Sequence, residues 1–350
     1  MQTSDVLNFS AQNGITGSYS TGTLTLTGTA TVADFKTALE SITFSTTSLV
    51  QVDRVIGFTV NDGTDSSATA TVLVDIAPEV NLSALDGSNG FQISGEAEND
   101  RSGRAVSGAG DVNGDGFADI LVGARLADPN GDQSGASYVV FGGTGFAGNL
   151  NLSALDGNNG FQITGAAAFD LSGTAVSAAG DVNGDGFADV LIGAPDADSN
   201  GVSQSGATYV VFGGASFAAN LNLSALDGSN GFKLSGEAVF DQSAVSVSAA
   251  GDVNGDGFAD VLIGAYFASP NGTRSGGSYV VFGHSGGFTA NLDLSALDGS
   301  NGFQISGEAV FDQSGVCITY PISPYKPIYP FTYKGLKVTL GEEKCGILTE

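Results

Sequence analysis

A nine-residue acidic string, Asp-Val-Asn-Gly-Asp-Gly-Phe-Ala-Asp, occurs three times without a change and constrains the fold more than any other feature of the chain. The copies occupy 111–119, 181–189 and 252–260, so their starts lie 70 and 71 residues apart. Each copy runs into an apolar, β-branched stretch. A fixed period of this kind indicates a repeat architecture, in which one supersecondary unit is built several times and neighbouring units bury its apolar surface.

The complete repeating unit contains four short apolar runs. It begins with Asn/Asp-Leu-Ser-Ala-Leu-Asp-Gly, at Asn81, Asn151, Asn222 and, for a fourth time, Asp293. The runs are Gly-Phe-Gln/Lys-Ile/Leu-Ser/Thr-Gly, a small-residue run before the acidic loop, a β-branched run after it, and Tyr-Val-Val-Phe-Gly. Short runs rich in Val, Ile, Tyr and Phe between Gly, Asn and Asp predict strands. Four antiparallel strands per unit are typical of a propeller blade, so we expect an all-β chain with a partial β-propeller.

The acidic loop has the residue pattern of a calcium site. Positions 1, 3, 5 and 9 supply side-chain oxygens, and the Phe at position 7 offers its backbone carbonyl. Calcium takes about six to eight oxygen ligands, and Gly at position 6 permits the sharp bend. Without a cation, three converging carboxylates repel one another. The predicted ligands in the three copies are Asp111, Asn113, Asp115, Phe117, Asp119; Asp181, Asn183, Asp185, Phe187, Asp189; and Asp252, Asn254, Asp256, Phe258, Asp260.

Two other interpretations explain less of the loop. An EF-hand needs a bidentate Glu at position 12, where this chain has Val122, Ile192 and Ile263. Hairpin-turn chemistry accounts for the Asn-Gly-Asp-Gly core, since these residues accept positive φ, but it places no demand on positions 1 and 9. By contrast, the segment 128–132, Asp-Pro-Asn-Gly-Asp, becomes Asp198-Ser-Asn-Gly-Val202 in the second unit and Ser269-Pro-Asn-Gly-Thr273 in the third. Its acids are lost stepwise while Asn-Gly stays, so we interpret it as a turn alone.

The sequence around the loop, Ser-Gly followed by Gly-Asp-Val-Asn-Gly-Asp-Gly-Phe-Ala-Asp-Ile-Leu-Val-Gly-Ala, resembles the FG-GAP repeat of integrin α-subunit propellers and of bacterial surface proteins. The resemblance implies a propeller of about seven blades. It also implies protein or glycan partners across one rim, and calcium, about three ions here, in loops on the opposite side. The family's Phe-Gly is replaced by Ser102-Gly103, Ser172-Gly173 and Ser243-Ala244, a departure that is largest in the third unit.

The first 77 residues form a different kind of unit. The runs 22–28, 55–60 and 68–76 alternate apolar and polar residues, which predicts half-buried strands, with a turn at Asn61-Asp62-Gly63. The segment resembles a cadherin-like or immunoglobulin-like β-sandwich, particularly through Phe58-Thr-Val-Asn-Asp-Gly, and we expect it to begin partway through that domain. Ile76-Ala-Pro78 is the expected linker to the repeats at 78–316.

A short helix is expected inside this first segment. Thr31 and Asp34 have the spacing of a helix capping box. Val32, Phe35 and Leu39 then fall on one helical face.

The repeat pattern stops at Val316, and residues 317–350 form an atypical Pro/Tyr-rich tail. Three full units and the start of a fourth are too few to close a propeller of about four to eight blades, so we expect a truncated or frame-altered product. The tail prolines recur every third residue, as in a polyproline II helix, although chance composition explains them as well. Cys317 and Cys345 either pair in a secreted chain or stay as two thiols. The prolines are Pro321, Pro324, Pro327 and Pro330.

Charge and composition narrow the function. A formal net charge of −26 disfavours nucleic acid and anionic membrane as partners. No apolar stretch is long enough to span a bilayer, so no membrane insertion is expected. Residues 1–10 have no signal-peptide pattern. We expect an extracellular or cell-surface protein, whose export would need either an upstream region or a C-terminal signal. His284, the single histidine, lies in a loop without triad partners, so no catalytic residue and no enzyme activity are predicted.

Three functions remain open. The first is a calcium-binding extracellular adhesion or recognition module, whose partner contacts the loops that vary between units, at 125–133, 195–204 and 266–274. The second is a non-catalytic structural spacer of a large surface protein. The third is an accessory repeat region of a secreted hydrolase or lyase.

Overall fold

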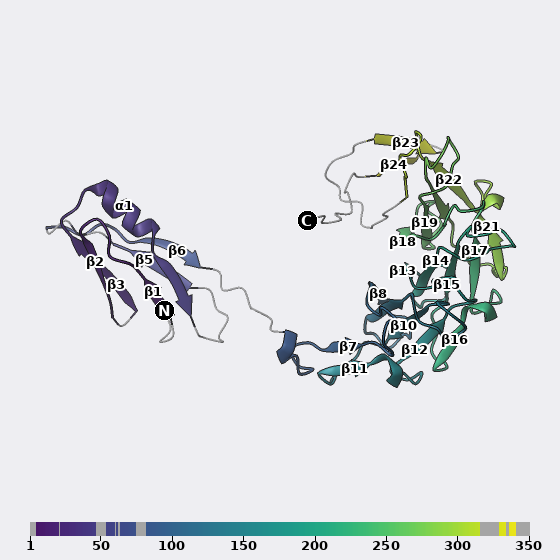
Figure 1. The fold of residues 1–350 in the computed structure, drawn as a ribbon, viewed down its shortest axis with the longest axis horizontal. Helices are drawn as coiled ribbons and strands as arrows, with labels where there is room; N and C mark the ends of the chain where they lie inside the picture. Colours follow the sequence, from purple (N-terminus) through teal and green to yellow (C-terminus); the bar gives the residue numbers. More distant parts are fainter. Residues whose placement is uncertain are drawn as a thin grey trace. The chain divides into compact units, whose positions relative to one another are not determined.

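The computed structural model describes residues 5–20, 22–46, 54–59, 61, 64–74, 82–315, 329–333 and 336–340 (Figure 1). The chain divides into two compact units, 1–84 and 85–350, which are described separately below. Several predictions fall outside the described residues: part of the Asn61-Asp62-Gly63 turn, the 76–78 linker, both cysteines and three of the four tail prolines.

The described part of the first unit consists of one helix and three two-stranded antiparallel sheets. The predicted strands at 22–28, 55–60 and 68–76 are confirmed with slightly different ends. The pairs are β1 (Asp5–Asn8) with β4 (Thr43–Thr46), β2 (Ile15–Ser20) with β3 (Thr23–Gly28), and β5 (Arg54–Phe58) with β6 (Ala70–Val74). These pairs do not by themselves establish a sandwich, so the cadherin-like assignment stays a prediction.

Helix α1 (Val32–Glu40) begins at the predicted capping box. The Thr31 hydroxyl accepts the Asp34 backbone N–H at 3.2 Å, and the Asp34 carboxylate accepts the Thr31 N–H at 3.1 Å. The apolar face is less buried than its spacing indicated, because Val32 is 89% exposed and the buried residue of the helix is Ala38. Val32 borders an open apolar hollow that Phe35 and Leu39 of the helix and Phe58 of β5 also line.

The second unit is built from three four-stranded antiparallel sheets of the kind predicted for propeller blades. Each is a meander in which the first two strands flank an acidic loop. The first blade contains β8 (Ala105–Gly110), β9 (Asp119–Ala124), β10 (Ala136–Val140) and β12 (Gly160–Thr164); the second β13 (Ala175–Gly180), β14 (Asp189–Ala194), β15 (Ala207–Val211) and β17 (Gly231–Ser235); the third β18 (Ser246–Gly251), β19 (Asp260–Ala265), β20 (Gly277–Val281) and β22 (Gly302–Ser306).

The blades are out of phase with the sequence repeat. The Gly-Phe-Gln/Lys run, which opens each sequence unit, is the fourth strand of the blade before it: β12 pairs with β10, β17 with β15, and β22 with β20. The expectation that each unit supplies all four strands of one blade was therefore wrong, because the pairing joins strands of successive units. Short strands add parallel edges: β16 (Asn220–Asn222) on β12, β21 (Asn291–Asp293) on β17, and β11 (Asn149–Asn151) on β7 (Gln92–Ser94).

Each sequence unit starts with a short 3-10 turn after its Asn or Asp. The side chains of Asn151, Asn222 and Asp293 each accept the N–H of the Ser two residues later, which caps the turn. The turns are η1 (Leu82–Ala84), η2 (Leu152–Ala154), η3 (Leu223–Ala225) and η4 (Leu294–Ala296).

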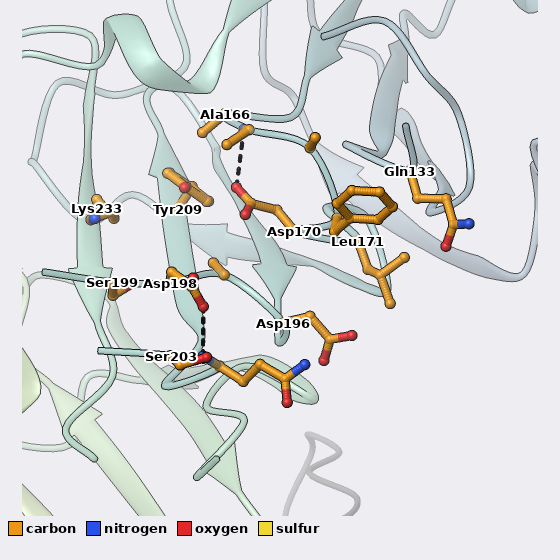
Figure 2. Close-up of a pocket in the computed structure, with 15 residues that line it drawn as sticks. Gln133, Ala166, Asp170, Leu171, Asp196, Asp198, Ser199, Ser203, Tyr209 and Lys233 are labelled. Carbon is orange, nitrogen blue, oxygen red and sulfur yellow. Dashed lines mark hydrogen bonds between the residues drawn. The ribbon is translucent and has the colours of Figure 1, made fainter. Parts of the chain in front are cut away.

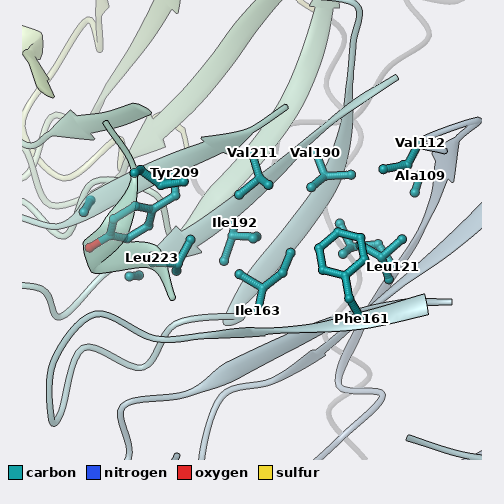
Figure 3. Close-up of a cluster of buried hydrophobic side chains, with 14 of the residues drawn as sticks. Ala109, Val112, Leu121, Phe161, Ile163, Val190, Ile192, Tyr209, Val211 and Leu223 are labelled. Carbon is teal, nitrogen blue, oxygen red and sulfur yellow. The ribbon is translucent and has the colours of Figure 1, made fainter. Parts of the chain in front are cut away.

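The core lies between neighbouring blades. The first strands β8, β13 and β18 contact one another in that order. One apolar cluster joins Leu121 and Phe161 of the first blade to Val190 and Ile192 of the second (Figure 3). The ring of Phe161 also stacks on Phe217 at 4.2 Å between centroids. Blades therefore bury their faces against one another, as a propeller requires, although closure of a ring is not established.

In the tail, β23 (Tyr329–Tyr333) and β24 (Leu336–Leu340) pair as an antiparallel hairpin. Pro330, the described member of the proline series, lies within β23. Among the described residues, no helix has the length and apolar character needed to cross a membrane.

Candidate metal loops and a neighbouring pocket

The three acidic strings form equivalent loops between the first two strands of each blade. In the first, Gly110 pairs with Asp119 across a β-bulge and adopts φ of 79°, which glycine tolerates without strain. The same bulge opens the loops after Gly180 and Gly251. The sequence prediction of a loop between two strands is thus confirmed in all three units.

Positions 1, 3 and 5 fold back onto the loop's own backbone. The Asp111 carboxylate accepts the N–H groups of Gly114, Asp115 and Gly116 at 2.8, 3.0 and 2.9 Å. The Asn113 side-chain oxygen accepts the Asp115 N–H at 3.0 Å, and Asp115 accepts the N–H at position 7 at 2.8 Å. The same bonds recur around Asp181 and Asp252. One carboxylate thus organises each turn.

Position 9 has a different environment. Asp119 is buried, and its two oxygens accept the N–H groups of Val112 at 2.8 Å and Gly142 at 2.7 Å. Asp189 and Asp260 make the equivalent pairs of bonds. This carboxylate therefore ties the start of the loop to the end of the third strand of its blade.

Burial raises the pKa of all three position-9 carboxyls. For Asp189 and Asp260 desolvation is the main cause, and it raises the pKa to about 7 and about 6 respectively. Their backbone hydrogen bonds act in the opposite direction because they favour the charged form. Negative charges at positions 1 and 5 of the same loop raise the pKa of Asp119 and Asp189 further.

The donor atoms of the loops are of the type that calcium binds, but their positions only partly converge on one point. Asp111, Asn113 and Asp115 offer the hard oxygens that calcium prefers. Across the residues that the structure describes, however, no three Asp, Glu, His or Cys side chains gather closely enough to hold an ion. Both oxygens of Asp119 already accept backbone hydrogen bonds. The ligand set of positions 1, 3, 5, 7 and 9 therefore stays a prediction.

The Phe at position 7 has a packing role that sequence reasoning missed. The ring of Phe187 lies against Gly114 of the preceding loop, and Phe258 lies against Gly184 in the same way. The backbone joins these loops too, because Ala188 N–H donates to the Asp111 carbonyl at 3.0 Å. A large aromatic side chain in every copy of an otherwise polar loop was the available signal.

The turn at 128–132 also does more than reverse the chain. The Asn130 side chain donates to the Gly165 carbonyl at 2.7 Å and to the Thr164 hydroxyl at 3.0 Å. In the third unit, Asn271 donates to the Gly307 carbonyl at 2.9 Å. The interpretation as a turn alone was therefore incomplete, since this Asn links its unit to the first strand of the next.

A partly buried polar network accompanies the first and third blades. The Tyr138 hydroxyl donates to the Glu96 carboxylate at 2.7 Å, and the Gln162 amide donates to both, at 3.0 and 3.2 Å. In the third blade, Tyr279 donates to Glu237 at 3.0 Å and receives a bond from Gln304 at 3.0 Å.

The second blade has a pocket in the same place. Ala166 stands at the position of the Glu and Lys233 at that of the Gln. A cavity of about 720 Å³ is lined there by Tyr209, Asp170 and Lys233, among others (Figure 2). Sequence reasoning missed this pocket. The signal was available, because Ala166 and Lys233 depart from the Glu and Gln that the other units repeat.

His284 is engaged locally. Its ring stacks on Phe288 at 4.0 Å between centroids, its Nδ1 accepts the Gly286 N–H at 3.1 Å, and its backbone N–H donates to the Val182 carbonyl at 3.0 Å. These contacts fit the predicted loop residue, and the absence of enzyme activity stays a prediction.

Three segments of the chain, 102–140, 172–211 and 244–281, match the FG-GAP repeat family. The chain therefore carries three FG-GAP repeats. Each matched segment contains the first three strands of one blade and its acidic loop.

The repeat region is similar to known animal proteins. Bovine (Bos taurus) phosphatidylinositol-glycan-specific phospholipase D is 30% identical over 221 residues, 60% of this chain and 24% of that protein. Integrin alpha pat-2 of Caenorhabditis elegans is 36% identical over 118 residues, 33% of this chain and 9% of that protein. Integrin alpha-5 of Xenopus laevis is 29% identical over 181 residues, 50% of this chain and 16% of that protein. The chain thus spans about a quarter or less of the length of these relatives.

Proposed function

We propose that this chain is a calcium-binding extracellular recognition module built from FG-GAP propeller repeats. The observation that carries the proposal is the threefold recurrence of one oxygen-rich loop with identical internal hydrogen bonds. Similarity to integrin alpha chains supports recognition of another molecule outside the cell. Calcium would be held by the oxygens at positions 1, 3 and 5 of each loop, joined by those at positions 7 and 9.

Equilibrium dialysis against calcium tests the metal part of the proposal. We expect about three ions per chain, with dissociation constants of about 10⁻⁴–10⁻³ M as in extracellular modules. A triple variant, Asp115→Ala with Asp185→Ala and Asp256→Ala, should bind none of them. A matched triple variant of surface acids outside the loops, Asp86→Ala with Asp156→Ala and Asp227→Ala, should keep all three. Absence of stoichiometric uptake by folded protein would refute the metal part.

The partner surface is proposed to be the set of loops that vary between units, 125–133, 195–204 and 266–274. In the third of these, the Arg274 guanidinium lies 4.5 Å from the centroid of the Phe267 ring, an arrangement that presents a cation and an aromatic face together. Protein or glycan arrays probed with the chain, with and without EGTA, test this part. Binding that survives both EGTA and exchange of the three loops would contradict it.

A second candidate is an accessory repeat region of a secreted hydrolase. The similarity over 60% of this chain to a phosphatidylinositol-glycan-specific phospholipase D favours it. Addition of the purified chain to a phospholipase assay distinguishes the two candidates. Faster turnover by the phospholipase when the chain is added would favour the accessory region, and unchanged turnover would favour the recognition module.

We further propose that the first segment is a cadherin-like or immunoglobulin-like sandwich of a bacterial surface protein. Its three antiparallel strand pairs support the all-β character. An experimental structure of the intact chain in which the three pairs form two packed sheets would support it, and any other packing would contradict it.

A further inference from the structure

The second blade differs from its neighbours at one partly buried network. In the first and third blades, a Glu accepts the Tyr hydroxyl and a Gln stands opposite that Tyr in the strand register. In the second blade, Tyr209 is retained, but Ala166 replaces the Glu and Lys233 pairs with Tyr209 in place of the Gln. The space that the Glu side chain occupies elsewhere is therefore left open.

The open space is a pocket of ligand size with an unsatisfied hydroxyl. Its volume is about 720 Å³, within the range of about 300–1,000 Å³ usual for small-molecule sites. Tyr209 lines it and is only 3% exposed. Its hydroxyl makes no hydrogen bond to any residue in the described part of the chain, whereas Tyr138 and Tyr279 are both bonded. Because Tyr209 lines the pocket and its hydroxyl has no protein partner there, this hydroxyl is available to hydrogen-bond a ligand.

Carboxylates dominate the charge of the pocket. Asp170 accepts the Ala167 N–H at 3.1 Å through one oxygen, and Asp198 accepts the Gln204 N–H at 2.8 Å through one oxygen. Their second oxygens receive no hydrogen bond from the described residues, and neither acid has an ion-pair partner within 4.0 Å there. A third acid, Asp196, also lines the pocket and is partly compensated by Arg125. Burial and the nearby charge of Asp198 raise the pKa of Asp170 to about 6.

The single cation restricts the ligand further. Lys233 is the basic residue among those lining the pocket, and its charge opposes a ligand that is cationic throughout. A ligand that complements these polar groups therefore presents N–H donors to Asp170 and Asp198, and oxygen acceptors to Lys233 and Tyr209. The methyl groups of Ala166, Ala167 and Ala168 supply a low wall on which a small ring can lie. Figure 2 shows these polar groups among the lining side chains.

We propose that the pocket bounded by Tyr209, Asp170, Asp198 and Lys233 binds a small hydroxylated amine of the amino-sugar class. Its ammonium group bonds the free oxygens of Asp170 and Asp198, and its hydroxyls bond Tyr209 and Lys233. This site is distinct from the acidic loops, and the proposal does not depend on calcium.

Calorimetric titration of the whole chain with glucosamine, and separately with glucose, tests the proposal. Saturable binding of glucosamine in the millimolar range or tighter is expected, with glucose weaker by about tenfold or more because it lacks the ammonium group. Absence of saturable glucosamine binding would overturn the proposal. Equal affinity for the two sugars would overturn the role of the acids.

A pair of substitutions that copies the neighbouring blades gives the decisive variant. Ala166→Glu with Lys233→Gln should rebuild the hydrogen-bonded network, close the pocket and abolish glucosamine binding, while the melting temperature stays the same or rises. The reverse exchange in the first blade, Glu96→Ala with Gln162→Lys, should create a second site, because Asp100 and Asp128 stand there at the positions of Asp170 and Asp198. Unchanged glucosamine affinity in the closed variant would refute the proposed pocket.

Two milder variants keep the test valid if the closed variant does not fold. Tyr209→Phe removes only the hydroxyl, and Asp170→Asn keeps the size of the side chain. Each should weaken glucosamine binding by about tenfold, and full affinity in both would refute the assignment. Ser153→Ala, at an exposed turn outside the pocket, is the matched control and should bind as the unmodified chain does.

Discussion

The ring of Phe187 lies over Gly114 of the preceding acidic loop, so close that a β-carbon added at Gly114 would fall 2.5 Å from its Cε1 atom. Phe258 lies over Gly184 in the same way, at 2.3 Å. The acidic loops are therefore not structurally independent of one another. The second and third loops each carry, at position 7, the side chain that covers the loop before it. A change of conformation in one of these loops should therefore alter the packing of its neighbour.

Substitution of Gly114 tests this contact. Gly114→Ala should destabilise the repeats by about 1 kcal/mol through its φ of 75° and by about a further 1–3 kcal/mol through overpacking against Phe187. Gly255→Ala is the matched control, because Gly255 has φ of 79° and open space around it. Urea unfolding of both variants measures the difference, and equal losses would show that the ring simply moves aside.

Position 5 and position 9 of the loop should respond differently to calcium. Asp115→Ala should lower the melting temperature only when calcium is present, because at about 100 times the dissociation constant one ion adds about 2.7 kcal/mol to the folded state. Asp119→Ala should lower it in chelator as well, since the N–H groups of Val112 and Gly142 lose their acceptor, at about 1–3 kcal/mol for each buried group. Calorimetric melts in calcium and in EGTA distinguish the two. Identical behaviour of both variants in EGTA would contradict this division of roles.

A buried ion pair should control the stability of the first unit. The Arg54 guanidinium lies 2.8 Å from the Asp5 carboxylate, and both side chains are buried. Asp5→Asn should cost about 3–5 kcal/mol, because it leaves a buried cation without its counter-charge. Lys36→Ala removes an exposed pair with Glu40 at 3.8 Å and should change stability by less than about 1 kcal/mol. Hydrogen exchange of the β5 amides reports the effect, and equal protection in both variants would contradict it.

Asp170 should give the repeats a pH-dependent stability. Because burial raises its folded pKa to about 6 from the ordinary 3.8, the folded state binds the proton more tightly than the unfolded state. The free energy of unfolding therefore falls as pH rises from about 4 to about 6, and levels off above. Asp170→Asn should make this fall smaller, which melting temperatures across that window would reveal. Asp260, whose folded pKa is also raised to about 6, supplies part of what remains. If the free energy of unfolding of the variant depends on pH as strongly as that of the unmodified chain, groups other than Asp170 cause the dependence.

The third repeat should gain stability from a glycine. Ala244 is buried at φ of 75°, where its counterparts are Gly103 and Gly173 at 83° and 81°. A non-glycine residue in this region costs roughly 1–2 kcal/mol, and the extra chain entropy of glycine costs about 0.5–1 kcal/mol. Ala244→Gly should thus raise stability by up to about 1 kcal/mol in urea unfolding. Gly173→Ala, whose β-carbon would fall 2.3 Å from the Ala136 carbonyl, should do the opposite.

The sequence predicted the local parts of the repeats well. Strands on either side of each acidic loop, the loop itself and the capping box at Thr31 all depend on residues close together in the chain, and all are present. The departure of Ala244 from the Gly of the other units was also visible and has a physical consequence in its backbone conformation.

What the sequence did not predict depends on contacts between distant segments. Periodicity locates the Gly-Phe-Gln/Lys run as a strand but does not say that β12 pairs with β10 of the unit before it. The two backbone bonds of Asp119 and the stacking of Phe187 on Gly114 likewise join residues whose spacing in the chain carries no signal. Val32 shows the converse, because its helical spacing suggested a packed face that the described chain leaves open.

The phase shift between blade and sequence repeat decides where the array can be shortened. Truncation at the end of the third sequence unit, just before Asp293, would remove β22, the strand that pairs with β20. The unpaired edge of β20 could then pair with strands of other chains. A cut placed after Ser306 keeps the third meander whole. For the same reason, adding or removing a whole sequence period keeps every strand paired as before. Such an array can therefore lengthen by duplication of whole units without any change to the contacts between blades.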